Sequence, residues 1–190
     1  RTFVPRRPDR PPAIWAGRPP APSRRAGGRT VYGPNIMSLT DLLSPEAVLP
    51  NLKATNKKLV LQELSERAAR ISGLPEREIF DALLQRERLG STGVGGGVAI
   101  PHGKLTRATR IFGVFARLEK PIDFEALDGA PVDLAFMLVA PEASGADHLK
   151  ALARIARVLR DPAQLATLRA ARDAAGIYAV LTQQSAPHAA

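Results

Sequence analysis

The chain has 190 residues, a formal net charge of +9 and no cysteine. Without cysteine it can hold no disulfide, thiolate zinc site, iron–sulfur cluster or cysteine nucleophile. A strongly basic chain suggests contact with the phosphates of nucleic acid, but that inference depends on where the charge lies.

Most of the charge lies in residues 1–36, which carry eight arginines, one acid and eight of the 17 prolines. This segment has no apolar periodicity and proline opposes regular structure, so we expect a disordered Pro/Arg-rich tail. It lacks the apolar core of a secretory signal. The first methionine is Met37, and we expect residues 1–36 to be upstream sequence. A basic arm that contacts nucleic acid or acidic lipid is the alternative.

The chain from Met37 onward has a net charge of only +2. We expect residues 37–184 to fold as one domain, large enough to bury roughly 68–70% of its unfolded surface, with residues 185–190 as a flexible C-terminus. No stretch approaches the roughly 20 apolar residues of a membrane-spanning helix. We therefore expect a cytoplasmic protein that neither inserts into a membrane nor binds nucleic acid.

The first part of this domain has helical patterns. A short helical turn is predicted over 38–43. A longer helix is predicted from a Thr55 or Asn56 cap to about residue 71, ended by Gly73, because apolar residues recur at steps of three and four. The next helix is predicted to have Pro75 in its first turn and to stop at Gly90. It carries three residues on one face: Ile79, Leu83 and Arg86.

Strand-like segments follow. Five glycines in eight residues make a loop over 90–97, and a short strand-like run over 98–100 leads to Pro101-His102-Gly103. Apolar runs over 111–118 and 132–139 do not alternate with polar residues, so we expect strands that are covered on both faces. The last part is again helical, with four residues at helical spacing: Leu149, Leu152, Ile155 and Leu159. Asp161-Pro162 starts a further helix, and a final one follows near Ile177. This order predicts a layered α/β domain.

The glycine loop is not a nucleotide-binding loop. Gly96 stands where a Walker A motif needs lysine, and the loop follows a helix rather than the strand that a dinucleotide fingerprint requires. Its backbone N–H groups could still form an anion-binding concavity. His102 follows it between Pro101 and Gly103. A neutral imidazole can accept a phosphoryl group and release it again, but a lone histidine beside a glycine loop is more often structural.

The residues of this region carry a resemblance to a known family. Residues 86–104 read RERLGSTGVGGGVAIPHGK, and PIDF at 121–124, PVDL at 131–134 and DHLKAL at 147–152 follow in order. This pattern resembles phosphotransferase-system enzyme IIA proteins of the fructose, mannitol and nitrogen-regulatory type, and is closest to the nitrogen-regulatory protein. The resemblance covers about residues 39–181. It implies a mixed β-sheet with helices on both faces, the IIA type-2 fold.

The resemblance also implies a phosphotransferase component without cofactor or metal. His102 would accept a phosphoryl group from a phosphocarrier of the HPr type, and Arg86 and His148 would assist. Ser91, Thr92 and Gly103 would bind the phosphate. The structural alternatives are that Arg86 pairs with Glu87 or Asp81, and that His148 is an ordinary helix residue. We expect Lys104 to be a solvated rim charge and His188 to be inert.

Three functions remain open. In the nitrogen-regulatory branch, which the run GSTGVGGGVAIPHGK favours, phosphorylation state is read by regulatory partner proteins. In the sugar branch, the phosphoryl group passes to a IIB protein. A binding regulator that is not phosphorylated is the third possibility, which the presence of His102, Arg86 and His148 disfavours.

Overall fold

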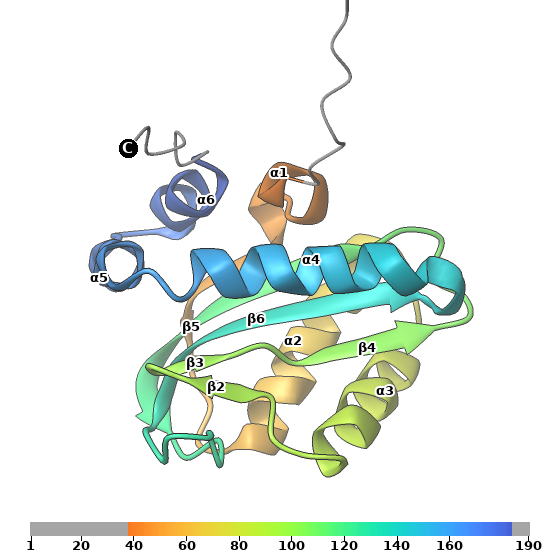
Figure 1. The fold of residues 1–190 in the computed structure, drawn as a ribbon, viewed down its shortest axis with the longest axis horizontal. Coiled ribbons are helices and arrows are strands. Elements are labelled where there is room, and N and C mark those ends of the chain that lie inside the picture. Colours follow the sequence, from red (N-terminus) through yellow and green to blue (C-terminus); the bar gives the residue numbers. More distant parts are fainter. Residues whose placement is uncertain (1–37, 184–190) are drawn as a thin grey trace, which may run out of the picture. The chain divides into compact units, whose positions relative to one another are not determined.

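The computed structural model describes residues 38–183, which form an α/β domain with a mixed sheet (Figure 1). The predicted tail over 1–36, the predicted flexible end over 185–190 and His188 lie outside the described residues. The helical elements are α1 (Leu39–Leu42), η1 (Pro45–Ala47), α2 (Lys57–Ser72), α3 (Glu76–Arg88), η2 (Glu142–Ser144), α4 (Gly145–Val158), α5 (Pro162–Ala170) and α6 (Ala174–Thr182). No helix in this range is long and apolar enough to cross a membrane.

The sheet has the order β1-β5-β6-β3-β2, with β4 also paired to β6. Its strands are β1 (Val48–Leu52), β2 (Gly93–Gly95), β3 (Val98–Ala99), β4 (His102–Leu105), β5 (Phe112–Ile122) and β6 (Val132–Pro141). The central pair β5 and β6 is antiparallel, whereas β1 pairs with β5 in parallel and β3 and β4 pair with β6 in parallel. The sheet is therefore mixed, as expected.

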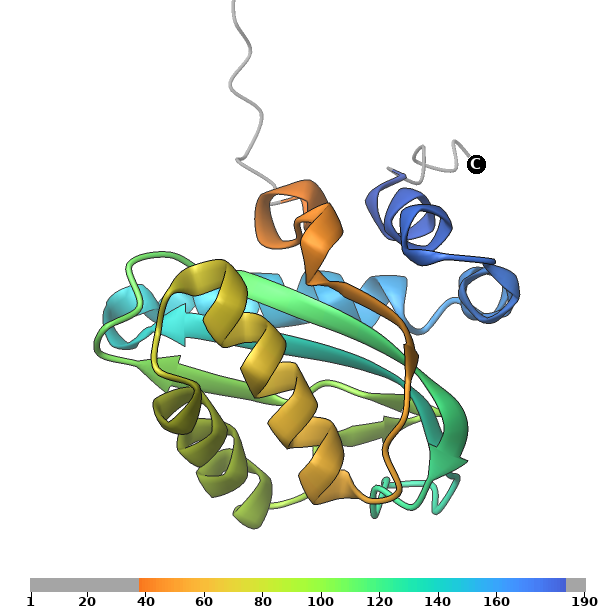
Figure 2. The ribbon, with the colours of Figure 1, turned by 180° about the vertical axis from the view of Figure 1, so that it is seen from behind.

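Helices cover both faces of this sheet. Figures 1 and 2 show α4 lying along one face and α2 along the opposite one, with α3 beside β4. The central strands are buried on both sides because consecutive residues of β6, from Leu134 to Ala140, are all buried. This explains why these runs lack polar alternation, and it confirms the two longest predicted strands.

The helix ends follow the predicted local chemistry. The Asn56 side chain accepts a hydrogen bond from the Leu59 backbone N–H at 3.0 Å, and Gly73 ends α2 in the left-handed conformation with φ of 72°. Asp161 caps α5 immediately before Pro162. Pro75 is the N-cap of α3 rather than a residue of its first turn. A Ser, Thr, Asp or Asn cap satisfies a backbone N–H that the first turn leaves without a partner.

Three strands were not predicted. β1 contains Pro50, which cannot donate to a ladder and argues against a strand except at a sheet edge, where β1 lies. β2 lies inside the predicted glycine loop. β4 begins at His102 itself, although the short run before it was expected to close there. These strands are short or glycine-rich. β1 and β4 form against the longer strands β5 and β6, and β2 pairs with the two-residue strand β3.

The inward face of α4 is not the one that the leucine spacing indicates. Leu149 stands at helical spacing with Leu152, Ile155 and Leu159, but it is 66% exposed. The buried residues of the first turns are instead His148 and Ala151. The spacing from His148 to Ala151 to Ile155 is also helical, so periodicity alone could not choose between the two registers.

Candidate functional site

The predicted histidines meet at a cavity of about 630 Å³. It lies where α3, the start of β4 and the start of α4 converge. Its lining consists of Ala82, Gln85, Arg86, Arg88, Leu89, His102, Gly103, Lys104 and His148. The fold thus brings together, from three elements, the predicted phosphoryl acceptor His102, the two predicted assisting residues Arg86 and His148, and the predicted phosphate-binding Gly103.

His102 is held by hydrogen bonds at both ring nitrogens. Nδ1 lies 2.8 Å from the carbonyl oxygen of Ile100, and the Arg86 Nε–H donates to Nε2 over 3.0 Å. A carbonyl can only accept and a guanidinium can only donate, so Nδ1 carries the proton and Nε2 carries the lone pair. The imidazole is therefore neutral in this arrangement, with its nucleophilic nitrogen on the Arg86 side.

Arg86 is fixed by a second contact, because its Nη1 donates to the Gly90 carbonyl at 3.0 Å. The alternative in which Arg86 pairs with Glu87 or Asp81 is wrong. Asp81 pairs with Arg77, and Glu87 pairs with Lys57. Arg86 shares the α3 face of Ile79 and Leu83, as predicted, and so it points toward β4.

His148 lies beside His102, with 5.7 Å between the ring centroids. It is buried, and its Nδ1 has no hydrogen-bond partner among the described residues. A buried nitrogen without a partner costs free energy unless a ligand or water satisfies it. His148 therefore lines the cavity with one ring nitrogen whose hydrogen-bonding capacity is unused.

The surroundings of both imidazoles favour the neutral form. Burial lowers the pKa of His102, and the Arg86 charge adds to this, although the hydrogen bond to Ile100 and the Glu87 charge oppose it. Burial, His102 and Lys104 lower the pKa of His148. Burial disfavours the charged imidazolium, and a like charge nearby does the same.

These shifts predict a pH dependence of stability. An unfolded histidine has a pKa of about 6.5, so on acidification the unfolded chain takes up these protons before the folded domain does. The stability that the two neutral histidines contribute is fully present above a pH of about 6.5. It is lost as the pH falls toward the lower pKa that each histidine has in the folded domain. Urea denaturation at a series of pH values from 8 to 5 should show that the free energy of unfolding decreases once the pH is below about 6.5. A His102→Gln, His148→Gln double variant with an unchanged pH profile would contradict this origin.

Gly103 has a packing role that the resemblance did not indicate. It is buried, and a Cβ at this position would lie 3.2 Å from the Ala82 Cβ on α3. The absence of a side chain lets β4 approach α3 closely enough for Arg86 to reach His102.

Gly103→Ala should therefore push α3 and β4 apart. We expect a loss of about 1 kcal/mol in the free energy of unfolding, as for other overpacked sites, and a weaker Arg86–His102 hydrogen bond. Thermal denaturation and the imidazole ¹⁵N shifts measure the two effects. Gly129→Ala is not a suitable control because of its positive φ, but at Gly176 in α6 a Cβ would meet its nearest atoms at 3.4 and 3.7 Å. Equal behaviour of Gly103→Ala and Gly176→Ala would contradict the prediction.

Ser91 and Thr92 do not line the cavity. The Ser91 hydroxyl donates to the Phe124 carbonyl at 2.8 Å. The Thr92 hydroxyl donates to Glu87 at 2.5 Å, and its backbone N–H also donates to that carboxylate. Both hydroxyls are thus used to hold the loop against neighbouring elements.

Glu87 is a site-supporting residue that the sequence reasoning missed. Its carboxylate is buried, accepts both Thr92 donors and lies 3.0 Å from the Lys57 ammonium. Hydrogen bonds to Glu125 and Glu87 hold the pKa of Lys57 above its usual value, although burial, the largest single influence, acts to lower it. The helical spacing does indicate that Glu87 is buried, because Glu87 lies four residues after the buried Leu83 on the same face of α3.

Glu87→Ala should be strongly destabilising. It leaves the Thr92 donors unsatisfied and Lys57 without its buried partner, which costs about 3 kcal/mol. Urea denaturation measures this loss. Glu78→Ala, which breaks an exposed pair with Arg107, is the matched control and should change stability by less than about 0.5 kcal/mol. Similar losses in the two variants would show that the Glu87 cluster is not a stabilising unit.

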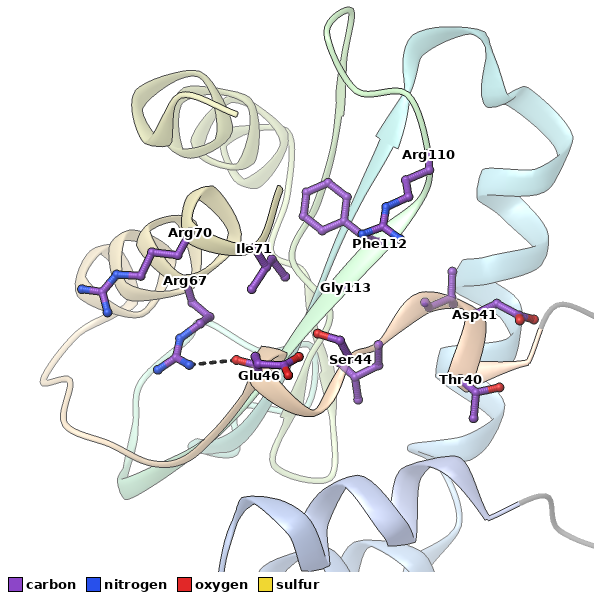
Figure 3. Close-up of a pocket in the computed structure, with 12 residues that line it drawn as sticks. Thr40, Asp41, Ser44, Glu46, Arg67, Arg70, Ile71, Arg110, Phe112 and Gly113 are labelled. Atoms are coloured by element: carbon purple, nitrogen blue, oxygen red, sulfur yellow. Dashed lines mark hydrogen bonds between the residues drawn. The ribbon is translucent and has the colours of Figure 1, made fainter. Parts of the chain in front are cut away.

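A second cavity, of about 560 Å³, lies between α1, η1, the end of α2 and the start of β5 (Figure 3). Three arginines contribute to its lining, Arg67, Arg70 and Arg110, and Arg67 donates to the Glu46 carbonyl at 2.8 Å. None of the predicted site residues lines it. Within residues 38–183, no group of three or more His, Asp or Glu side chains is placed to hold a metal ion.

Comparisons with known proteins agree with this fold. The family model described as "Phosphoenolpyruvate-dependent sugar phosphotransferase system, EIIA 2" matches residues 41–184. A nitrogen regulatory protein of Bradyrhizobium diazoefficiens is 63% identical over 145 residues, covering 76% of this chain and 95% of that protein. The nitrogen regulatory protein of Escherichia coli K12 is 42% identical over 147 residues, covering 77% and 90%. The crystal structure of IIA-Ntr from Neisseria meningitidis matches with 34% identity and a TM-score of 0.72, covering 75% of this chain and 97% of that one.

Proposed function

This chain belongs to the EIIA 2 family of the phosphoenolpyruvate-dependent sugar phosphotransferase system, and we propose that it accepts a phosphoryl group on His102 from a phosphohistidine carrier of the HPr type. We further propose that it regulates partner proteins through its phosphorylation state. The observation that carries the proposal is the hydrogen bonding of His102, with Nδ1–H on Ile100 and the Nε2 lone pair toward Arg86.

The transfer step follows from this geometry. Nε2 of neutral His102 attacks the phosphorus of the carrier's phosphohistidine and forms a new N–P bond. The N–P bond of the carrier breaks, and its electron pair returns to the carrier's imidazole. The proton stays on Nδ1, which remains hydrogen-bonded to the Ile100 carbonyl. This hydrogen bond stabilises the positive charge that the ring of His102 acquires.

Arg86 changes partner during this step. Its Nε–H must leave the Nε2 lone pair when phosphorus arrives, and it then lies next to the phosphoryl oxygens. The contact of Nη1 with Gly90 keeps the guanidinium in place. Phosphoryl transfer requires mainly positioning and charge stabilisation, which a guanidinium supplies well.

His148 is proposed to assist rather than to accept. Its neutral ring lies beside His102 and can donate one N–H to a phosphoryl oxygen. The Gly103 backbone lies next to the same position. Ser91 and Thr92 would contact the phosphoryl group only after exchanging their present acceptors, Phe124 and Glu87.

Phosphorylation in vitro tests the proposal. The protein is incubated with phosphoenolpyruvate, the first enzyme of the system and its phosphocarrier. Intact-mass spectrometry should show the gain of one phosphoryl group. The modification should be acid-labile, as an N–P bond is, and peptide mapping should place it on His102. No gain of mass would overturn the proposal and favour the non-phosphorylated binding regulator. A group mapped to a hydroxyl residue would overturn the assignment of His102 as the acceptor.

His148→Ala in the same assay should leave acceptance in place, with slower transfer or a shorter-lived phosphoprotein. An unchanged rate and lifetime would assign His148 to structure alone.

The regulatory branch is supported by relatives named nitrogen regulatory protein that match over nearly their whole length. The sugar branch remains the second candidate because the matching family model is described by sugar transfer. Incubating the phosphoprotein with fructose-type and mannitol-type IIB proteins separates the two. Efficient passage of the phosphoryl group to either IIB protein would establish the sugar branch and remove the regulatory one.

A further inference from the structure

The lining of the cavity around His102 carries cations and no carboxylate, and the nearby buried Glu87 is paired with Lys57. Of the residues that line the cavity, three are Arg or Lys, two are His and none is Asp or Glu. Arg86 donates hydrogen bonds to His102 and to the Gly90 carbonyl. Arg88 and Lys104 make no ion pair within residues 38–183, and both are exposed. We call Arg88 and Lys104 the cationic rim.

This lack of partners contrasts with the cations nearby. On α3, Arg77 pairs with Asp81, and just beyond β4, Arg107 pairs with Glu78. Lys150 on α4 pairs with Asp147. Arg154 and Arg157 on α4 also make no ion pair within residues 38–183, but neither lines the cavity. Arg88 and Lys104 are thus distinguished as unpaired cations of the cavity lining. Lys104 also acts at the cavity electrostatically, since its charge helps to lower the pKa of His148.

An exposed apolar side chain lies next to the cationic rim. Leu89 lines the cavity between Arg88 and the glycine loop, and it is 85% exposed. Leu149, which follows His148 on α4, is 66% exposed. Large exposed leucines at a functional cavity are typical of a protein-binding surface with an apolar centre and a charged edge.

From these observations we propose that the phosphoryl donor docks on Leu89, Arg88 and Lys104 with an acidic face. This inference rests on the proposed function, because it describes the protein that delivers the phosphoryl group to His102. Two unpaired cations repel a basic face and attract carboxylates. Such complementarity acts mainly on the association rate and on the choice of partner, and it weakens as salt screens the charges.

Charge reversal at the rim tests the docking face. Single-turnover transfer to His102 is followed from the purified phosphorylated phosphocarrier of the system, at low and high salt. The Arg88→Glu, Lys104→Glu double variant should lower kcat/KM by about tenfold at low salt, with kcat at saturating donor unchanged. High salt should slow the unaltered protein and shrink the difference. Leu89→Ala should raise KM at both salt concentrations.

The matched control is the Arg77→Glu, Arg107→Glu double variant. It has the same change in net charge, with one position on α3 and one just beyond β4, but neither residue lines the cavity. It should lose less than twofold of kcat/KM if the effect is local. Circular dichroism spectra of both double variants check that they fold.

The outcomes separate the two proposals. If the unaltered protein is phosphorylated on His102 but the rim variant is unaffected, faster, or slowed only as much as the control, the acidic docking face is wrong and the proposed function stands. If transfer from the carrier fails in the unaltered protein, both are wrong. A fall in kcat rather than in kcat/KM would place Arg88 and Lys104 in the chemical step and overturn their docking role.

Discussion

Replacing His102 with alanine should abolish phosphoryl acceptance. The substitution removes the only ring nitrogen that combines a fixed lone pair with a guanidinium partner in this cavity. Among the described residues, the remaining imidazole is that of His148, whose ring centroid lies 5.7 Å away. The expected result is that intact-mass spectrometry detects no phosphorylated species after incubation with the complete donor system.

His102→Gln distinguishes loss of the nucleophile from loss of the fold. A glutamine amide oxygen can still accept a hydrogen bond from Arg86, but the amide is not a phosphoryl acceptor. It should therefore melt close to the unaltered protein and yet take up no phosphoryl group. His188→Ala is the control for loss of a histidine and should be phosphorylated normally. Transfer that persists in either His102 variant would show that another residue is the acceptor.

Replacing Arg86 with alanine should have the second largest effect. The variant loses the donor that aligns Nε2 and the positive charge beside the developing phosphoryl charge. Removing one such preorganised donor lowers catalytic rates by about 10²–10³-fold. We expect a fall of this size in the single-turnover rate at saturating donor, measured by rapid quench.

Two further variants sharpen this prediction. Arg86→Lys should recover little activity, because one ammonium cannot bond Gly90 and His102 as the planar guanidinium does. Arg77→Ala, on the same helix but in a surface pair with Asp81, should transfer at the unaltered rate. Because Arg86 helps to lower the pKa of His102, the ¹⁵N titration of His102 should also move to higher pH in Arg86→Ala. A normal rate in Arg86→Ala would reduce Arg86 to a structural contact.

The two central strands and most helices were predictable because their signals are local, whereas the mixed sheet was implied by the family resemblance. The Asn56 cap and Gly73 define the ends of α2, and the unbroken apolar runs of β5 and β6 indicate central strands. β1, β2 and β4 were not predictable in this way. Their residues, including Pro50 and the glycines of 93–95, have weak strand preference. β1 and β4 form by pairing with strands far along the chain, and β2 pairs with the two-residue strand β3.

The functional region shows the same division. The motif over residues 86–104, with His102 and Arg86, could be identified from the sequence, as could the family that it resembles. The burial of Glu87 against Lys57 was not, because it depends on where α2 places Lys57 relative to α3. The exposure of Leu149 and the burial of His148 depend on which face of α4 meets the sheet.

By itself, the sequence determined the separation of a basic, proline-rich segment from a nearly neutral domain, and it located the histidine-centred motif. Both are properties of composition and order, which need no contacts to be read. The tertiary structure alone decided the state of His102. The proton on Nδ1 and the lone pair on Nε2 follow from a carbonyl two residues away and a guanidinium sixteen residues away. The hydrogen-bond partners of a histidine decide which ring nitrogen carries the proton, and the fold brings those partners to His102.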